Sequence, residues 1–96
     1  MNTAILKNWG ITLNCGGYLD PMLAKKQLHG FICDDSRGVF PDGMRITTSN
    51  INYVIDKESC KIVVTRNTHY TIFADEINPE YKKQFPNAYE QLGKPL

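Results

Sequence analysis

The segment MRITTSNINYVID, residues 44–56, carries the pattern on which the fold prediction depends. At its start, alternation places three residues on one face of an extended chain: Met44, Ile46 and Thr48. A second set also shares a face: Ile51, Tyr53 and Ile55. An odd number of steps separates the two sets. We therefore expect the parity to change near Ser49 and Asn50, through a bulge or a tight turn between two strands.

Towards the C-terminus, the short polar segment DKES at 56–59 predicts a hairpin between Tyr53–Ile55 and Cys60–Thr65. The segment RNTH then separates this strand from YTIFA, whose β-branched and aromatic residues favour extended structure. In the tail, Asn78 and Pro79 are suited to start a short helix that Pro86 interrupts before a further helical turn. Its aromatic residues Tyr81, Phe85 and Tyr89 recur every four positions, which predicts packing on the protein's own sheet or on a second copy.

Towards the N-terminus, PDG at 41–43 and DDSRG at 34–38 are typical of turns, and FIC at 31–33 of a short apolar strand with Cys33 in the core beside Phe31. Further upstream, Asp20 and Pro21 have the composition of a helix start, and Gly30 that of a helix stop. We expect a helix over Pro21–His29, and either a short helix or an extended lead-in over residues 3–9.

These elements predict a single α+β domain over residues 1–96. Its β part is a four- to five-stranded antiparallel meander, or a small partly open barrel, over about 30–75. One N-terminal helix, within a helical part over about 1–30, packs on it, and a short helical tail covers about 76–96. A chain of 96 residues is long enough for one core only.

Composition excludes several functional classes. The formal net charge is only +1, so nucleic-acid or membrane binding would need a local basic cluster. No stretch reaches the roughly 20 apolar residues of a membrane span, and the start lacks the continuous apolar stretch of a secretion signal. Three widely spaced cysteines, Cys15, Cys33 and Cys60, favour reduced thiols. We therefore expect a cytoplasmic protein that is not membrane-bound.

Polar side chains gather around two turns and two predicted strands, and they form our candidate binding site: Arg37, Arg45, Thr48, Ser49, Arg66 and Asn67. The strand region also contains the basic and aromatic residue types that bind single-stranded nucleic acids: Arg37, Arg45, Lys61, Arg66 and His69, with Tyr53, Tyr70 and Phe73. Acidic residues share the same region, which favours a solvated face. Nucleic-acid binding is therefore the alternative to a protein-binding site.

Catalysis and metal binding have less support. His29, Cys33 or His69, together with a nearby aspartate, would supply the residue types of a nucleophile and a base. A buried Cys33 beside two aspartates would have a raised pKa, however, and would be a poor nucleophile. The histidines and cysteines show no metal-ligand spacing, and SRGVFPDG is not followed by the helix that a phosphate loop needs. We predict no catalytic set, no metal and no cofactor, and we keep a small enzyme as the less favoured alternative.

The block GFICDDSRGVFPDGMRITTSNI and the later IVVTRNTHYTI resemble a group of small hypothetical proteins of phages, plasmids and integron gene cassettes. The matching positions cover part of residues 30–72: Arg37, Gly38, Phe40, Asp42, Gly43, Ile46, Thr48, Ser49, Ile51, Val64, Thr65, Arg66, Asn67 and Tyr70. The resemblance implies residence on a mobile element and no catalytic residues to carry over. Val39 stands where such proteins often have a basic residue, which weakens an anion-binding interpretation of the loop.

Together, residues and resemblance favour a mobile-element binding module that acts on a protein partner or in regulation. A short meander also leaves free strand edges, so we expect a homodimer through a sheet edge or through the aromatic tail.

Overall fold

The protein is described here from a computed structural model, which places residues 2–14 and 25–92. Within these two ranges, six strands, one 3-10 helix and two short helices follow one another. Their bounds are β1 Asn2–Asn14, β2 Lys25–Cys33, β3 Met44–Asn50, β4 Tyr53–Asp56, β5 Lys61–Val64, β6 Thr68–Ile72, η2 Ala74–Glu76, α1 Pro79–Gln84 and α2 Ala88–Gln91. No helix in these two ranges is long and apolar enough to cross a membrane.

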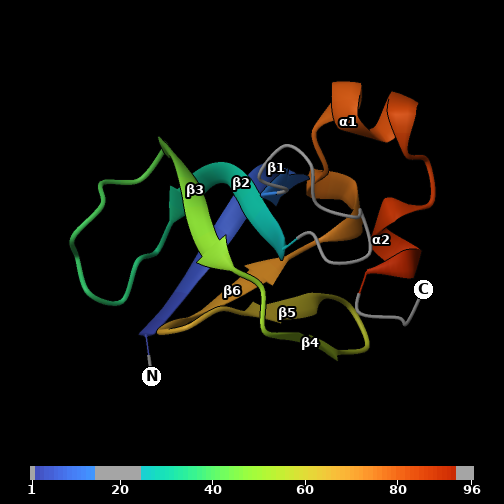
Figure 1. The fold of residues 1–96 in the computed structure, drawn as a ribbon. Coiled ribbons are helices and arrows are strands. Elements are labelled where there is room, and N and C mark those ends of the chain that lie inside the picture. Colours follow the sequence, from blue (N-terminus) through green and yellow to red (C-terminus); the bar gives the residue numbers. More distant parts are fainter. Residues whose placement is uncertain (1, 15–24, 93–96) are drawn as a thin grey trace.

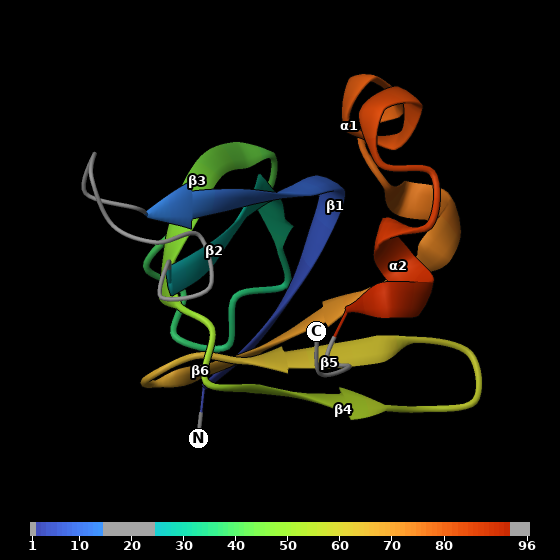
Figure 2. The ribbon, with the colours of Figure 1, turned by 45° about the vertical axis from the view of Figure 1, so that its right-hand side comes forward.

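The six strands form one mixed sheet in the order β3-β2-β1-β6-β5-β4. β1 is central and pairs with β2 in antiparallel and with β6 in parallel orientation. Figures 1 and 2 show the sheet strongly curled, with α1 and α2 at one end of it. The predicted α+β fold, an antiparallel meander or small barrel of four or five strands covered by an N-terminal helix, is therefore wrong.

The parallel pair follows from the segment 44–56. The antiparallel pairings give β3 the direction of β1, and β4 the direction of β6. Because β1 and β6 are parallel, β3 and β4 also run the same way round the sheet. The chain therefore does not reverse at Ile51 and Asn52, but passes from one edge strand directly to the other. In a pure meander every connection reverses the chain, and this single step without reversal makes the sheet mixed.

The predicted change of parity within this segment is confirmed as a β-bulge in β3. Leu28 of β2 faces two residues of β3, Thr48 and Ser49. The Thr48 hydroxyl accepts a hydrogen bond from the Leu28 N–H at 3.0 Å and donates one to the Ser49 carbonyl at 2.8 Å. The side chain thus satisfies a buried backbone group that the bulge leaves without its ladder partner.

The predicted helix over Pro21–His29 is also wrong where the structure tests it, because Lys25–His29 belongs to β2. Residues 21–24 lie outside the described ranges. β2 is paired on both sides, with β1 and with β3, and this pairing outweighs the helix propensity of the segment. Residues 3–9 are likewise extended, as part of β1.

A second bulge, in β1, sets the shape of the sheet centre. Asn8 and Trp9 together face Gly30, and Asn8 has a φ of 53°. A Cβ on Gly30 would lie 2.8 Å from the Lys7 carbonyl oxygen, so only glycine fits opposite the bulge. Gly30 is therefore a site of close strand approach, and not the helix stop that the sequence suggested.

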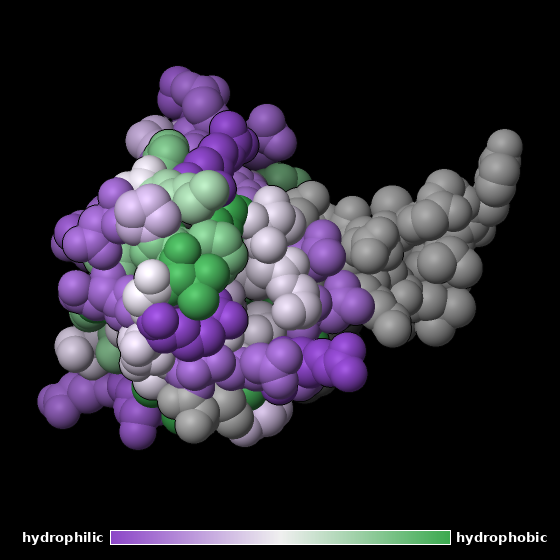
Figure 3. Space-filling view, turned by 90° about the vertical axis from the view of Figure 1, so that its left-hand side faces the viewer, coloured by the Kyte–Doolittle hydropathy of each residue, from purple (hydrophilic) through white to green (hydrophobic). Residues whose placement is uncertain are grey.

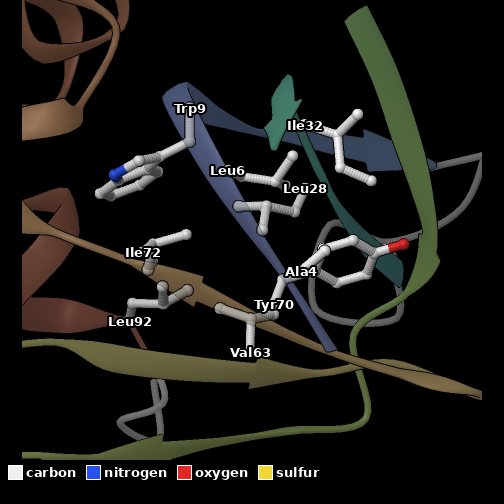
Figure 4. Packing of buried hydrophobic residues seen from close by; sticks show 9 residues of the cluster. All are labelled: Ala4, Leu6, Trp9, Leu28, Ile32, Val63, Tyr70, Ile72 and Leu92. Carbon is white, nitrogen blue, oxygen red and sulfur yellow. The ribbon is translucent and has the colours of Figure 1, made fainter. Parts of the chain in front are cut away.

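The core occupies the concave side of the curled sheet (Figure 4), where side chains from strands far apart in the sequence point toward one another. Its members are Ala4, Leu6, Trp9, Leu28, Ile32, Val63, Tyr70, Ile72 and Leu92. In β2 the inward residues are Leu28 and Ile32, so Phe31 and Cys33 point to the other face. The expectation that Cys33 enters the core beside Phe31 is therefore wrong, because Ile32, which lies between them, is the residue that points inward.

The tail packs on Trp9, the largest fully buried side chain. The indole nitrogen donates to the Phe73 carbonyl at 2.8 Å, and the ring centroid lies 6.4 Å from Tyr81 and 6.1 Å from Tyr89. Asn78 caps α1 as predicted, accepting from the backbone N–H groups of Glu80 and Tyr81. The tail aromatics therefore belong largely to the protein's own interior.

Candidate functional site

The six candidate residues do not form one cluster. Arg37 lies in the loop between β2 and β3, and Arg66 and Asn67 form the turn between β5 and β6. The other three lie on β3: Arg45, Thr48 and Ser49. A hydrogen bond connects the end of β3 with the strand that leads into the β5–β6 turn. The Asn52 N–H, two residues after β3, donates to the Val64 carbonyl at the end of β5, at 2.8 Å.

Thr48 is not available as a binding residue. It is only 5% exposed, and its hydroxyl is already shared between the Leu28 N–H and the Ser49 carbonyl. The turn at Arg66 and Asn67 is exposed and is closed by a hydrogen bond from the Thr65 N–H to the Thr68 carbonyl at 3.0 Å. Thr48 therefore has a structural role, whereas the two turn residues stay accessible.

The β2–β3 loop is organised by the Asp35 carboxylate. It accepts hydrogen bonds from three backbone N–H groups and from one side chain: those of Arg37, Val39 and Phe40, and the Arg37 Nε. Partial burial acts to raise the pKa of Asp35, but the hydrogen bonds and the Arg37 charge outweigh it and lower the pKa. The Asp35 carboxylate is thereby held ionised and fixes the path of the loop.

Arg37 is consequently committed to its own loop. Its Nε lies 3.3 Å from the Asp35 carboxylate, and its guanidinium lies over the Phe40 ring, 5.7 Å from the centroid. The loop is further tied to β1, because the Ser36 N–H donates to the Thr3 carbonyl and the Ser36 hydroxyl accepts from the Thr3 N–H. The loop therefore presents a fixed surface in which Arg37 plays a mainly internal part.

A row of three exposed side chains crosses the outer face of the sheet and was missed in the sequence. Lys7 of β1 pairs with Phe31 of β2, which pairs with Arg45 of β3, and all three are exposed. No ion pair to Lys7 or Arg45 is found among the placed residues. The signal in the sequence was the alternation through Leu28 and Ile32, which turns Phe31 outward once the segment is read as a strand.

Exposed apolar side chains also occur on the hairpin formed by β2, β3 and the loop between them. Figure 3 shows an apolar area ringed by hydrophilic residues on the side of the molecule that carries the β2–β3 loop. Among the described residues, the exposed large apolar side chains are Phe31, Val39, Met44, Tyr53 and Phe85. Three of the five belong to the β2–β3 hairpin, with Val39 the most exposed at 62%. We call five residues the hairpin surface: Lys7, Phe31 and Arg45 on the outer face of the sheet, Val39 in the loop, and Met44 at the loop end of β3, where its pairing with Ile32 places it on the other face.

The basic and aromatic residues suggested for nucleic-acid binding are only partly available. Lys61 is buried, and its ammonium lies 3.0 Å from the Leu92 carbonyl, 3.2 Å from the Asp56 carboxylate and 4.9 Å from the centre of the Tyr89 ring. Tyr70 is part of the core. Lys61 therefore holds Leu92, the residue directly after α2, on β5, and its ammonium is already occupied by these partners.

The residues of the enzyme alternative are also apart. His29 and Cys33 lie four residues apart on one strand, and His69 lies two strands away on β6, paired with Thr3. Burial raises the pKa of the Cys33 thiol, as do three nearby carboxylates: Asp34, Asp42 and Glu76. Lys7 acts in the opposite direction and does not reverse the shift. The thiolate needed for nucleophilic attack is thus disfavoured.

His29 lies beside Gly10 and close to Arg45. A Cβ on Gly10 would lie 2.7 Å from the His29 Nε2 and 3.2 Å from the Tyr81 ring, so the imidazole fills space that only glycine leaves free. Burial and the Arg45 charge lower the pKa of His29. His29 is therefore held neutral as part of the packing between β1, β2 and the tail. Within the described ranges, no three His, Cys, Asp or Glu side chains are grouped to hold a metal ion.

Comparison with known proteins adds no assignment. No protein-family model, no curated protein and no solved structure matches this chain.

Proposed function

We propose that this protein is a binding module that recognises a protein partner through the hairpin surface. The observation that carries the proposal is the concentration of exposed apolar side chains on the β2–β3 hairpin, next to two cations without an ion-pair partner among the described residues. Aromatic, methionine and arginine side chains are enriched at protein interfaces, and an exposed apolar area such as the one in Figure 3 is a frequent sign of one.

The organisation of the loop supports the same function. Asp35 and Ser36 fix the loop to itself and to β1, and Val39 nevertheless remains exposed. A loop that is ordered before binding loses little conformational entropy on association. The exposed Val39 and Met44 are thus presented on a fixed frame.

The proposal is tested by capturing partners in the native host with a photo-crosslinking residue at position 41, within the loop. The variant Val39→Asp should lose the crosslinked partner, and the matched variant Phe85→Asp should keep it, because Phe85 is similarly exposed but lies at the end of α1. Equal loss in both variants, or in neither, would contradict recognition through the hairpin surface.

Binding of single-stranded nucleic acid is the second candidate. The specific observation is the row in which Phe31 lies between Lys7 and Arg45, since an aromatic ring flanked by cations can stack a base and contact phosphates. Binding of oligothymidine that weakens steeply with salt and is lost in Phe31→Ala would support it. Absence of binding at low salt would exclude it.

The predicted homodimer also remains a proposal. Since Tyr81 and Tyr89 pack on Trp9, the aromatic tail offers mainly Phe85, and the free edges of β3 and β4 are the remaining surfaces. Sedimentation at increasing concentration tests it, and a monomer throughout would contradict it.

We also propose that the protein is cytoplasmic and is encoded on a mobile element, as its sequence suggests. Cys33 and Cys60 are free thiols, which is consistent with a reducing compartment. Cell fractionation tests the location, and inspection of the neighbouring genes tests the association with phage, plasmid or integron sequences.

A further inference from the structure

β3 has a free edge in the described part of the sheet. β3 lies at the end of the strand order and pairs only with β2. Its regular part covers Met44–Thr47, before the bulge at Thr48 and Ser49. A strand at a sheet edge presents unpaired N–H and C=O groups, to which another extended segment can add.

The side chains on the outer face of this edge favour a particular charge in a strand that adds to it. Arg45 points outward beside Phe31, and Lys7 lies on the far side of that ring. A residue directly across from Arg45 in a neighbouring strand would have its Cβ about 5 Å away, which is suited to an ion pair. The outward residues of the added strand should therefore be acidic.

The side chains on the inner face of this edge favour apolar residues in the added strand. Ile46 is half-buried against the core, and Met44 is 45% exposed at the end of the strand. The alternate residues of an added strand would cover these two side chains and continue the core outward. The favoured occupant thus alternates apolar and acidic residues.

We propose that the edge of β3 binds an extended segment of a partner protein with alternating apolar and acidic side chains, by strand addition along Met44–Thr47. This rests on the proposed protein-binding function and names the chemistry of its ligand. A second copy of β3 fits less well, because its sequence MRITTSN contains no acidic residue and its second half is bulged.

The test is a titration of the ¹⁵N-labelled full chain with the blocked hexapeptide Val-Glu-Val-Glu-Val-Glu, observed by amide chemical shifts. We expect saturable shifts centred on Met44–Thr47. The peptide Val-Lys-Val-Lys-Val-Lys should bind roughly tenfold more weakly, because attraction to Arg45 is replaced by repulsion.

The variant Arg45→Glu should reverse this preference, and circular dichroism should show that it is folded. Methylation of alternate peptide nitrogens on the pairing edge should abolish binding.

Equal affinity for the acidic and basic peptides, unchanged binding after methylation, or shifts elsewhere would overturn the strand-addition proposal. If the peptides fail while the crosslinked partner still depends on Val39, the protein-binding function stands without strand addition. If oligothymidine shifts the same amides and the peptides do not, the surface binds nucleic acid and both protein proposals fail.

Discussion

Two irregular parts of the molecule each depend on a non-glycine residue with positive φ, and they use it in opposite ways. Asn8, with a φ of 53°, forms the bulge that turns Trp9 into the core and gathers the tail around it. Asp34, with a φ of 52°, starts the β2–β3 loop, in which hydrogen bonds to carboxylates fix the backbone while Val39 stays exposed.

The difference shows which part is built for stability and which is available for contact. At the Asn8 bulge, the Trp9 indole N–H and carbonyl are both hydrogen-bonded, and the indole ring is covered by the tail. At the Asp34 loop, the N–H groups of Asp34 and Val39 are also hydrogen-bonded, but the Val39 side chain is left exposed. Changes at the first region should therefore alter folding, and changes at the second should alter binding.

The largest effect is expected for Trp9→Ala. Removal of a fully buried indole that contacts Tyr81 and Tyr89 should lower the free energy of unfolding by about 3–5 kcal/mol. Phe85→Ala, at a half-exposed aromatic of the same tail whose ring centroid lies 5.1 Å from that of Tyr81, should lower it by only about 1 kcal/mol. Urea denaturation measures both, and similar losses would refute the central role of Trp9.

Gly30→Ala should come next, at about 3 kcal/mol, because the new Cβ would lie 2.8 Å from a backbone oxygen that cannot move freely. Gly38→Ala in the loop meets open space and should cost only the strain of its φ of 66°, about 1 kcal/mol. The comparison of the two thermal midpoints checks this order. A larger loss for the loop variant would show that the bulge region is able to relax.

Thr48→Val should lower the free energy of unfolding by about 1–3 kcal/mol, since the shape is kept while the buried Leu28 N–H loses its acceptor. Thr47→Val is the matched control, because this neighbour is exposed on the outer face of the same strand and should shift stability by less than about 0.5 kcal/mol. Chemical denaturation of the pair tests whether Thr48 is structural. Equal values would restore it as a candidate binding residue.

A pH dependence should arise from His29. Its pKa is lowered in the folded state by burial and by Arg45, so the unfolded chain binds the proton more readily. The contribution is complete above pH 6.5, the ordinary pKa, and is lost as pH falls through the window down to the folded pKa. Unfolding midpoints measured across this range should decline less in His29→Gln than in the natural chain. An unchanged slope would show that His29 does not titrate differently on folding.

The smallest effect on stability is expected for Val39→Ser, within about 0.5 kcal/mol, because 62% of this residue is already exposed. Its effect on partner capture should instead be large if the comparison of the two regions is correct. Denaturation and crosslinking of the same variant measure both quantities. A substantial loss of stability would mean that Val39 packs on its own loop in solution.

Much of the local structure could be predicted from the sequence. The strands near FIC, MRITTSN, YVID and KIVV, the hairpin at DKES and the helix start at Asn78 were all indicated by alternation or turn residues, and they are confirmed. Of the candidate site, Arg45 and Ser49 are exposed on β3 and Arg66 and Asn67 in their turn, but Arg37 is engaged by Asp35 and Thr48 is buried. The sequence patterns indicated the residue types of the site, but not the groups with which Arg37 and Thr48 interact in the folded chain.

What the sequence alone determined is where the chain is extended and where it turns, because alternation and turn residues act over a few positions. The tertiary structure decided the rest. The step from β3 to β4 without reversal at Ile51 and Asn52 makes the sheet mixed, and the pairing of Lys25–His29 with both neighbours makes it a strand. Both results depend on hydrogen bonds to residues distant in the chain, which no local pattern contains. For the same reason, the row of Lys7, Phe31 and Arg45 became a surface only when three strands lay side by side.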